Sequence, residues 1–269
     1  MIDGEKRIRA AFAAAHDEGR AALMPYMMAG YPDRDTGLAV AEAYVDSGAD
    51  LMELGVPFSD PLADGPTIHA AGTLALENGA TLRTALEICE AVADRIPVVL
   101  MAYVNMVLAH GGAKEFARLA AAAGAAGAIV PDLPLGEAED VRDAFAEAGL
   151  AMVPLVAPTT SPERRRQICD VATGFIYLVS TVGTTGERGA LPAGLADLVA
   201  ATKADAGETP VAVGFGIGTA AQAAEIGGVA DGVIIGSRMV RAAGEGANPA
   251  ESADAVAEFL AETRVALAG

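Results

Sequence analysis

Short apolar runs alternate with alanine-rich amphipathic segments about eight times along the chain. Continuous apolar runs are typical of parallel strands that are covered on both faces, and the segments between them have helical spacing. No linker and no change in composition interrupts the alternation. The pattern therefore predicts an α/β fold in which helices join parallel strands.

The alternation also predicts where the elements lie. Strands are expected at residues 22–28, 51–54, 98–101, 127–130, 151–155, 175–178, 211–213 and 232–235. Helices are expected at residues 35–47, 81–94, 113–123, 137–148, 161–169, 195–203, 219–226 and 250–267, and an extra helix at residues 4–17. We predict a single (β/α)8 TIM barrel over residues 1–269, with the extra helix at its N-terminus.

A doubly wound open sheet is the alternative fold for this alternation. Such a sheet normally carries a glycine-rich turn after its first strand. Here the first strand runs into Gly30-Tyr31-Pro32-Asp33, which is not a dinucleotide-binding fingerprint. In a barrel the chemistry lies at the C-terminal ends of the strands, so functional residues are expected there.

Composition limits the partners and the compartment. The chain has 36 acidic and 18 basic residues, which argues against nucleic acid and anionic membranes, because both require basic surface. No apolar run is long enough to span a membrane, and the N-terminus lacks the apolar stretch of a secretory signal. Cys89 and Cys169 lie far apart and show no metal-ligand spacing. We therefore expect a cytoplasmic protein with reduced thiols and no metal site.

The second predicted strand carries Glu53 and runs into a loop rich in glycine and proline that ends at Asp64. Strand residues alternate between two faces, so Glu53 shares a face with Leu51. Inside an apolar barrel, burial would raise the pKa of Glu53 and suit it to proton transfer with Asp64 as its partner. The alternative is a solvated charge at a strand end and an aspartate that caps a turn.

Glycines follow the sixth, seventh and eighth predicted strands, at Gly186, Gly216 and Gly236. Backbone N–H groups in such loops can approach an anion closely. Gly236 and Ser237 open a short helix, whose N-terminus favours negative charge. The pattern indicates a phosphate site, with turn formation alone as the other interpretation.

Together these residues resemble the tryptophan synthase alpha chain family. Residues 51–68 read Leu-Met-Glu-Leu-Gly-Val-Pro-Phe-Ser-Asp-Pro-Leu-Ala-Asp-Gly-Pro-Thr-Ile, the segment most distinctive of that family. Further matches follow in order at residues 25–26, 30–32, 131–134, 177, 183–186 and 214–217, so the resemblance covers essentially the whole chain. It implies a TIM barrel that cleaves indole-3-glycerol phosphate to indole and glyceraldehyde 3-phosphate, the last stage of L-tryptophan biosynthesis.

The resemblance also implies a role for each matching residue. Glu53 would be the general acid and base, and Asp64 would accept the indole N–H. Phosphate would be bound by Gly186, Gly216, Gly236 and Ser237. Thr185 would close the site, and the apolar pocket would be formed by Tyr26, Leu100, Leu155, Tyr177, Phe215 and Ile234.

A tryptophan synthase beta chain is the partner that the resemblance implies, in an alpha2-beta2 tetramer. Pro57, Asp60, Asn105 and Pro134 match segments that face it. Pyridoxal phosphate would belong to the beta chain, and this chain would need no cofactor. Three other functions stay open: a standalone indole-3-glycerol-phosphate lyase, an isomerase on another phosphate-binding barrel, and a non-catalytic regulatory subunit. The loop after Gly186 looks shorter than in relatives, and Tyr26 stands where phenylalanine is common.

Overall fold

The computed structural model describes residues 3–109, 111–137, 139–180, 194–214 and 216–269. Within these residues, nine parallel strands form one sheet in the order β5-β4-β3-β2-β1-β9-β8-β7-β6. The strands are β1 (Ala22–Met28), β2 (Met52–Gly55), β3 (Val98–Met101), β4 (Gly127–Ile129), β5 (Ala151–Met152), β6 (Leu155–Val156), β7 (Ile176–Val179), β8 (Val211–Gly214) and β9 (Gly232–Ile235). The predicted strands are confirmed, except that the fifth is divided into β5 and β6.

The division of the fifth strand lies where the barrel closes. The N–H of Val153 donates to Ala128 O at 2.9 Å, and the N–H of Tyr177 donates to Pro154 O at 3.0 Å. Residues 151–156 therefore join the β4 side to the β7 side, although Pro154 has no N–H for a regular ladder. The predicted TIM barrel is confirmed.

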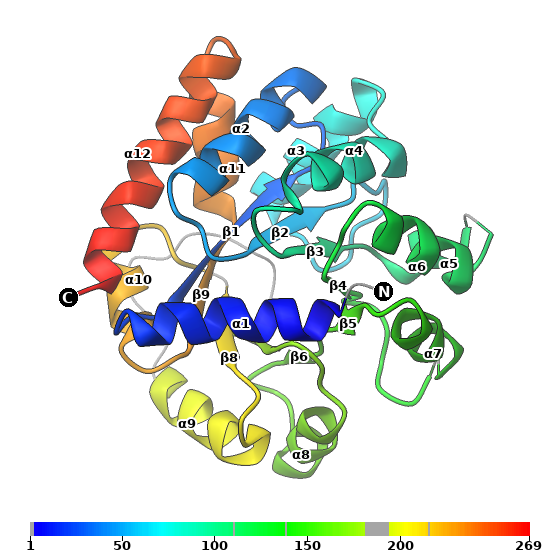
Figure 1. Ribbon diagram of the computed structural model, residues 1–269, viewed down its shortest axis with the longest axis vertical. Coiled ribbons are helices and arrows are strands. Elements are labelled where there is room, and N and C mark those ends of the chain that lie inside the picture. The colour runs from blue at the N-terminus through cyan, green and yellow to red at the C-terminus, as the bar shows by residue number, and fades with distance from the viewer. Residues whose placement is uncertain (1–2, 110, 138, 181–193, 215) are drawn as a thin grey trace.

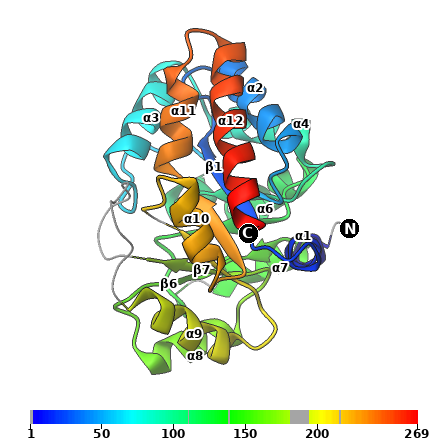
Figure 2. The same cartoon turned by 90° about the vertical axis from the view of Figure 1, so that its left-hand side faces the viewer.

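Helices surround the strands (Figure 1). They are α1 (Gly4–Asp17), α2 (Arg34–Asp46), α3 (Pro66–Glu77), α4 (Leu82–Val92), α5 (Val104–Ala109), α6 (Ala113–Ala122), α7 (Glu139–Glu147), α8 (Pro162–Asp170), α9 (Leu195–Ala206), α10 (Ala220–Gly227), α11 (Ser237–Glu245) and α12 (Pro249–Leu267). In Figure 2, α11 and α12 run side by side. Among the described helices, none is long and apolar enough to cross a bilayer.

Local capping groups set where several helices begin. The Ser161 hydroxyl accepts the N–H of Arg164 at 3.2 Å, and Pro162 occupies the first helical position of α8. The Thr219 hydroxyl accepts the N–H of Gln222 at 3.2 Å at the start of α10. Each bond satisfies a backbone donor that the first helical turn leaves unpaired, so the predicted starts are confirmed.

The sequence pattern did not predict α3 and α5, and it predicted only the beginning of α11. Helix α3 buries Ile68, Ala71, Gly72 and Ala75, which are mostly small residues and form a weak apolar stripe. Helix α5 spans only six residues, too few for a periodic pattern. Both helices lie in loops that follow strand ends, and α3 follows Asp64 closely.

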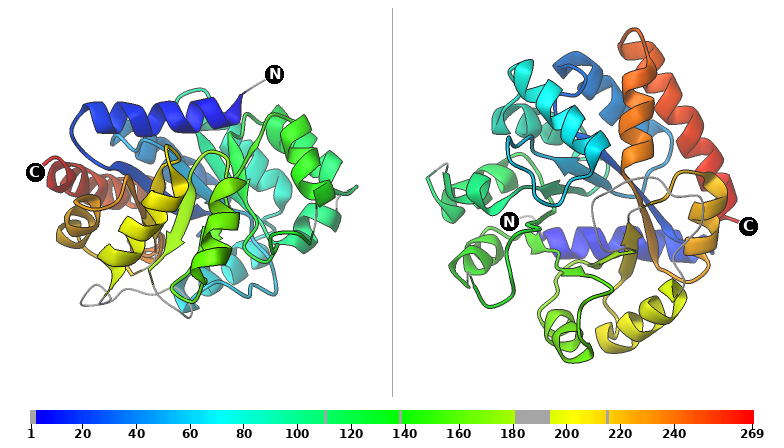
Figure 3. Two further views of the ribbon diagram at one scale, coloured as in Figure 1. Left: turned by 90° about the horizontal axis from the view of Figure 1, so that it is seen from below. Right: turned by 180° about the vertical axis from the view of Figure 1, so that it is seen from behind.

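Helix α1 lies across one end of the strands, as Figures 1 and 3 show. Its residues Ile8, Phe12 and Ala15 join a core cluster inside the barrel that also contains Leu51 and Phe175. The N–H of Gly4 donates to Gly149 O at 2.9 Å, which fixes the start of the helix. The extra helix is therefore confirmed, and it fills the N-terminal end of the barrel.

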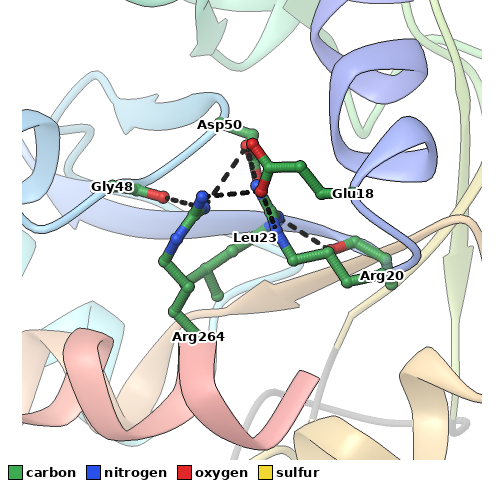
Figure 4. A network of polar contacts seen from close by, with 7 residues as sticks. Glu18, Arg20, Leu23, Gly48, Asp50 and Arg264 are labelled. Carbon is green, nitrogen blue, oxygen red and sulfur yellow. Dashed lines mark hydrogen bonds and ion pairs between the residues drawn. The ribbon is translucent and has the colours of Figure 1, made fainter. Parts of the chain in front are cut away.

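A charged network lies at this same end (Figure 4). The Arg20 guanidinium donates to both oxygens of Asp50, at 2.6 and 2.8 Å, and the N–H of Leu23 donates to Asp50 at 2.8 Å. Arg264 of α12 donates to Gly48 O at 2.9 Å and to Glu18 at 2.8 Å. The network joins the segments before β1 and β2 to the C-terminal helix.

Candidate active site

Glu53 points into the barrel. Its neighbours Met52 and Leu54 pack in the layer between strands and helices, whereas Leu51 packs in the interior cluster. Alternation along β2 therefore places Glu53 on the interior face, as predicted. The residue is 3% exposed, and within the described part of the chain its Oε2 has no hydrogen-bond partner. Burial, followed by the charge of Asp64, raises its pKa from 4.5 to about 8.

Asp64 lies at the end of the loop after β2, just before α3, and is partly buried. The Tyr103 hydroxyl donates to its Oδ1 at 3.0 Å. Burial raises the pKa of Asp64, while the Tyr103 hydrogen bond and the charge of His69 oppose the rise. The structure thus brings Glu53 and Asp64 close enough for the charge of one to affect the other.

The two carboxyl groups face a common cavity with an open volume of about 600 Å³ inside it and at its mouth. A volume of this size fits a small-molecule ligand. The walls are mainly apolar, with the carboxyls on one side and glycines on another. The lining residues are Tyr26, Glu53, Ala63, Asp64, Ile68, Met101, Ile129, Pro131, Leu155, Tyr177, Gly216, Ile217, Gly236 and Ser237.

Two strand-end glycines make room for tyrosines in this cavity. A Cβ on Gly55 would collide with the Tyr26 hydroxyl, and a Cβ on Gly214 would collide with the Tyr177 hydroxyl. Burial, together with the charges of Asp64 and Glu53, raises the pKa of both tyrosines, so both hydroxyls stay protonated. The absence of side chains on these glycines therefore shapes the apolar pocket.

Glycines form another part of the cavity wall. Gly216 has a φ of +84°, a left-handed conformation that favours glycine. Gly236 is the N-cap of α11, and Ser237, which is buried, is its first residue. Both segments line the cavity, so the N-terminus of α11, which favours anions, lies at the cavity wall.

The structure corrects one of the predicted pocket residues. Leu100 pairs in register with Leu54 and packs in the outer layer, so its prediction as a pocket residue is wrong. Met101, one position further along β3, lines the cavity instead. Ile234 lies in the interior cluster but is not among the lining residues. Tyr26, Leu155 and Tyr177 do line the cavity.

The other predicted site residues are three substrate-site residues and four partner-interface residues. Thr185, Gly186 and Phe215 lie outside the described residues. Asp60, Asn105 and Pro134 are exposed, in segments that follow β2, β3 and β4, so a partner could reach them. Pro57 is buried, so this side chain offers no surface for contact.

The sequence pattern missed several lining residues, namely Ala63, Ile68, Met101, Ile129, Pro131 and Ile217. Met101 turns inward because Glu53 pairs with Val99 and side chains alternate along β3, and this register is seen only in the structure. The sequence pattern also did not predict Tyr103 as a site residue. Its bond to Asp64 joins residues that are 39 positions apart, which no local pattern shows.

No cluster of three potential metal-ligating side chains occurs within the residues that the structure describes. A parallel barrel with a carboxyl pair and a glycine-lined wall at the C-terminal ends of its strands defines a TIM-barrel enzyme for acid–base chemistry on a small ligand.

Comparison with known proteins agrees with this class. The family model for the tryptophan synthase alpha chain matches residues 12–267. The alpha chain of Deinococcus radiodurans is 42% identical over 256 residues, 94% of each chain. The tryptophan synthase of Saccharomyces cerevisiae is 42% identical over 243 residues, which are 89% of this chain but 34% of the yeast protein. A structure of Mycobacterium tuberculosis tryptophan synthase matches with a TM-score of 0.89 and 39% identity, covering 97% of this chain and 98% of the other.

The chain belongs to the tryptophan synthase alpha chain family. Alpha chains of this family are lyases that cleave indole-3-glycerol phosphate in tryptophan biosynthesis. The resemblance read from residues 51–68 is therefore confirmed at the level of family, fold and reaction.

Proposed function

We propose that Glu53 is the general acid and base of the cleavage. The observation that supports this most directly is a buried carboxyl whose Oε2 has no partner in the described part of the chain and which faces the cavity. With its pKa raised to about 8, Glu53 holds a proton at neutral pH and can donate it. It would protonate the indole ring carbon at the scissile bond and take the proton of the glycerol hydroxyl.

Asp64 supplies the second function in this proposal. Its carboxylate accepts the indole N–H and stabilises the positive charge that develops on the protonated ring. The carbon–carbon bond then breaks as a retro-aldol step, with the ring as electron sink. The position of Asp64 on the wall that also carries Glu53 supports this division of roles.

The glycine-lined and apolar parts of the cavity would bind the substrate. We propose that Gly216, Gly236 and Ser237 bind the phosphate, together with Gly186. The apolar wall formed by Tyr26, Met101, Leu155 and Tyr177, together with Phe215, would receive the indole ring. Thr185 would help to close the site over the substrate, because the matching residue of the family lies in a mobile loop.

We also propose that residues 1–269 act as one cytoplasmic domain with a tryptophan synthase beta chain as partner, in an alpha2-beta2 assembly. The exposed side chains of Asp60, Asn105 and Pro134, in segments that follow β2, β3 and β4, support this face for the partner. This chain would work without a cofactor, and pyridoxal phosphate would belong to the beta chain. Cys89 and Cys169 are free and buried, which fits a reducing compartment.

An assay of the purified chain with indole-3-glycerol phosphate tests the proposal. We expect indole to form without a cofactor, and faster when a beta chain is added. Activity independent of the beta chain would favour the standalone lyase instead. Absence of turnover under both conditions would favour the non-catalytic regulatory subunit and contradict the role of Glu53.

A further inference from the structure

Tyr103 lies in the short segment between β3 and α5 and is 3% exposed. Its hydroxyl donates to Asp64 Oδ1 at 3.0 Å and accepts the backbone N–H of Ala63 at 3.0 Å. The N–H of Ala63 can only donate, so the single hydroxyl proton of Tyr103 is directed at the carboxylate. Tyr103 itself is not among the residues that line the cavity.

The Tyr103 side chain is held firmly at this position. Its ring packs against Phe58 with 5.3 Å between ring centroids. Its carbonyl accepts the N–H groups of Met106 and Val107, at 2.9 and 3.2 Å, in the first turn of α5. Tyr103 thus contacts three residues of the loop after β2, which are Phe58, Ala63 and Asp64, and ties this loop to β3.

Several ionisable side chains act on Asp64 from the elements around it. One of them is Glu53, because two carboxylates that share one cavity repel each other and a proton on either one relieves the repulsion. The groups that face Asp64 are Glu53 of β2, Tyr26 of β1, Tyr177 of β7, Tyr103 beyond β3 and His69 of α3.

The hydrogen-bond donors are distributed unequally between the two carboxyls. Asp64 receives the Tyr103 hydroxyl, whereas Oε2 of Glu53 has no partner in the described residues. A donor stabilises the ionised form of the carboxyl that it contacts. The pKa of Tyr103 is itself raised by burial and by the charge of Asp64, so Tyr103 stays a donor at neutral pH.

We propose that Tyr103 is a positioning residue that keeps Asp64 ionised and oriented, and thereby leaves the shared proton on Glu53. The proposal rests on the proposed function, in which Asp64 accepts the indole N–H. Tyr103 acts through Asp64 and does not touch the substrate. Before substrate binds, Tyr103 thus keeps Glu53 as the acid and Asp64 as the anion.

Tyr103→Phe tests this, because it removes only the hydroxyl. We expect kcat/KM to fall roughly ten- to a hundredfold, as expected for a lost hydrogen bond to a charged group. The acid limb of the kcat/KM–pH profile should move to higher pH, since Asp64 would lose a donor that lowers its pKa. A purely structural role would not move this limb.

The double variant Tyr103→Phe/Asp64→Asn shows whether Tyr103 acts through Asp64. In the Asp64→Asn background the hydroxyl should matter by no more than about threefold, because its carboxylate partner is gone. Tyr44→Phe is the matched control, because Tyr44 is buried and does not line the cavity, and its hydroxyl donates to the backbone O of Tyr26 at 3.0 Å. It should lose stability to a similar extent but keep the wild-type pH profile.

The outcomes separate this inference from the function on which it rests. If Tyr103→Phe keeps the wild-type acid limb while Asp64→Asn is impaired, the role of Tyr103 is overturned and that of Asp64 stands. Independent, multiplicative losses in the double variant would also overturn it. Wild-type kcat/KM in Asp64→Asn would overturn the proposed role of Asp64 and, with it, that of Tyr103.

Discussion

Two carboxyl groups three residues apart, one just before β2 and one within it, have opposite surroundings. Asp50, just before the strand, is bound by both nitrogens of the Arg20 fork and by the N–H of Leu23 (Figure 4). Glu53, inside the strand, is buried, yet its Oε2 has no partner among the described residues. The N-terminal end of the barrel pairs its charges, and the C-terminal end leaves a carboxyl to face a cavity.

The difference shows how one strand serves both stability and chemistry. A buried ion pair that loses one partner is strongly destabilised, so the Arg20–Asp50 pair holds the base of the barrel together. A buried carboxyl without a cation keeps its proton and can transfer it near neutral pH. Asp50, at the N-terminal end of the barrel, therefore contributes to stability, whereas Glu53, which faces the cavity, is available for chemistry.

Replacing Glu53 should have the largest effect. In Glu53→Gln we expect kcat for indole formation to fall about 10³- to 10⁴-fold, since a positioned general acid and base is lost. Circular dichroism and the melting temperature should show a folded chain. Glu90→Gln, on the exposed side of α4, is the control and should keep its turnover. Normal turnover in Glu53→Gln would remove Glu53 from the mechanism.

The raised pKa of Glu53 predicts a pH-dependent stability. Between its ordinary value of 4.5 and its folded value of about 8, the folded chain holds a proton that the unfolded chain has released. The stabilisation is therefore complete below pH 4.5 and is lost as the pH rises through about 8. At about 1.4 kcal/mol per pH unit, the loss has an upper bound of about 5 kcal/mol. Urea unfolding of wild type and Glu53→Gln should show the two stabilities diverging across this range.

Removing the Arg20–Asp50 ion pair should lower the stability and leave the chemistry intact. In Arg20→Met we expect the free energy of unfolding to fall by about 3–5 kcal/mol, because the partly buried Asp50 would lose both short bonds to the Arg20 guanidinium. Turnover per folded molecule should not change. Arg118→Met removes an exposed pair with Glu115 and should cost less than about 1 kcal/mol. Equal losses in the two variants would contradict the contrast between the ends.

Replacing the partly buried carboxylate should have a smaller effect than replacing Glu53. In Asp64→Asn we expect kcat/KM to fall about a hundredfold, which corresponds to one lost electrostatic contact in the transition state. Glu77→Gln, at the exposed end of α3, is the control. If Asp64→Asn lost more activity than Glu53→Gln, the roles of the two carboxyls would have to be exchanged.

Several features could be predicted because they depend on local periodicity. Alternating apolar runs predicted the strands, and the face shared by Leu51 and Glu53 predicted an inward carboxyl. Prediction was wrong for Leu100, where the inward face of β3 depends on its register with β2. It missed α3, whose buried face is made of small residues.

The sequence by itself determined the strand order along the chain, the inward direction of Glu53 and, through residues 51–68, the family. Only the tertiary structure decided that Met101 and not Leu100 faces the cavity, that residues 151–156 close the barrel, and that Tyr103 bonds Asp64. The reason is physical. The direction of a side chain on a strand follows from local geometry, whereas its partners depend on the register and closure of strands that are distant in sequence.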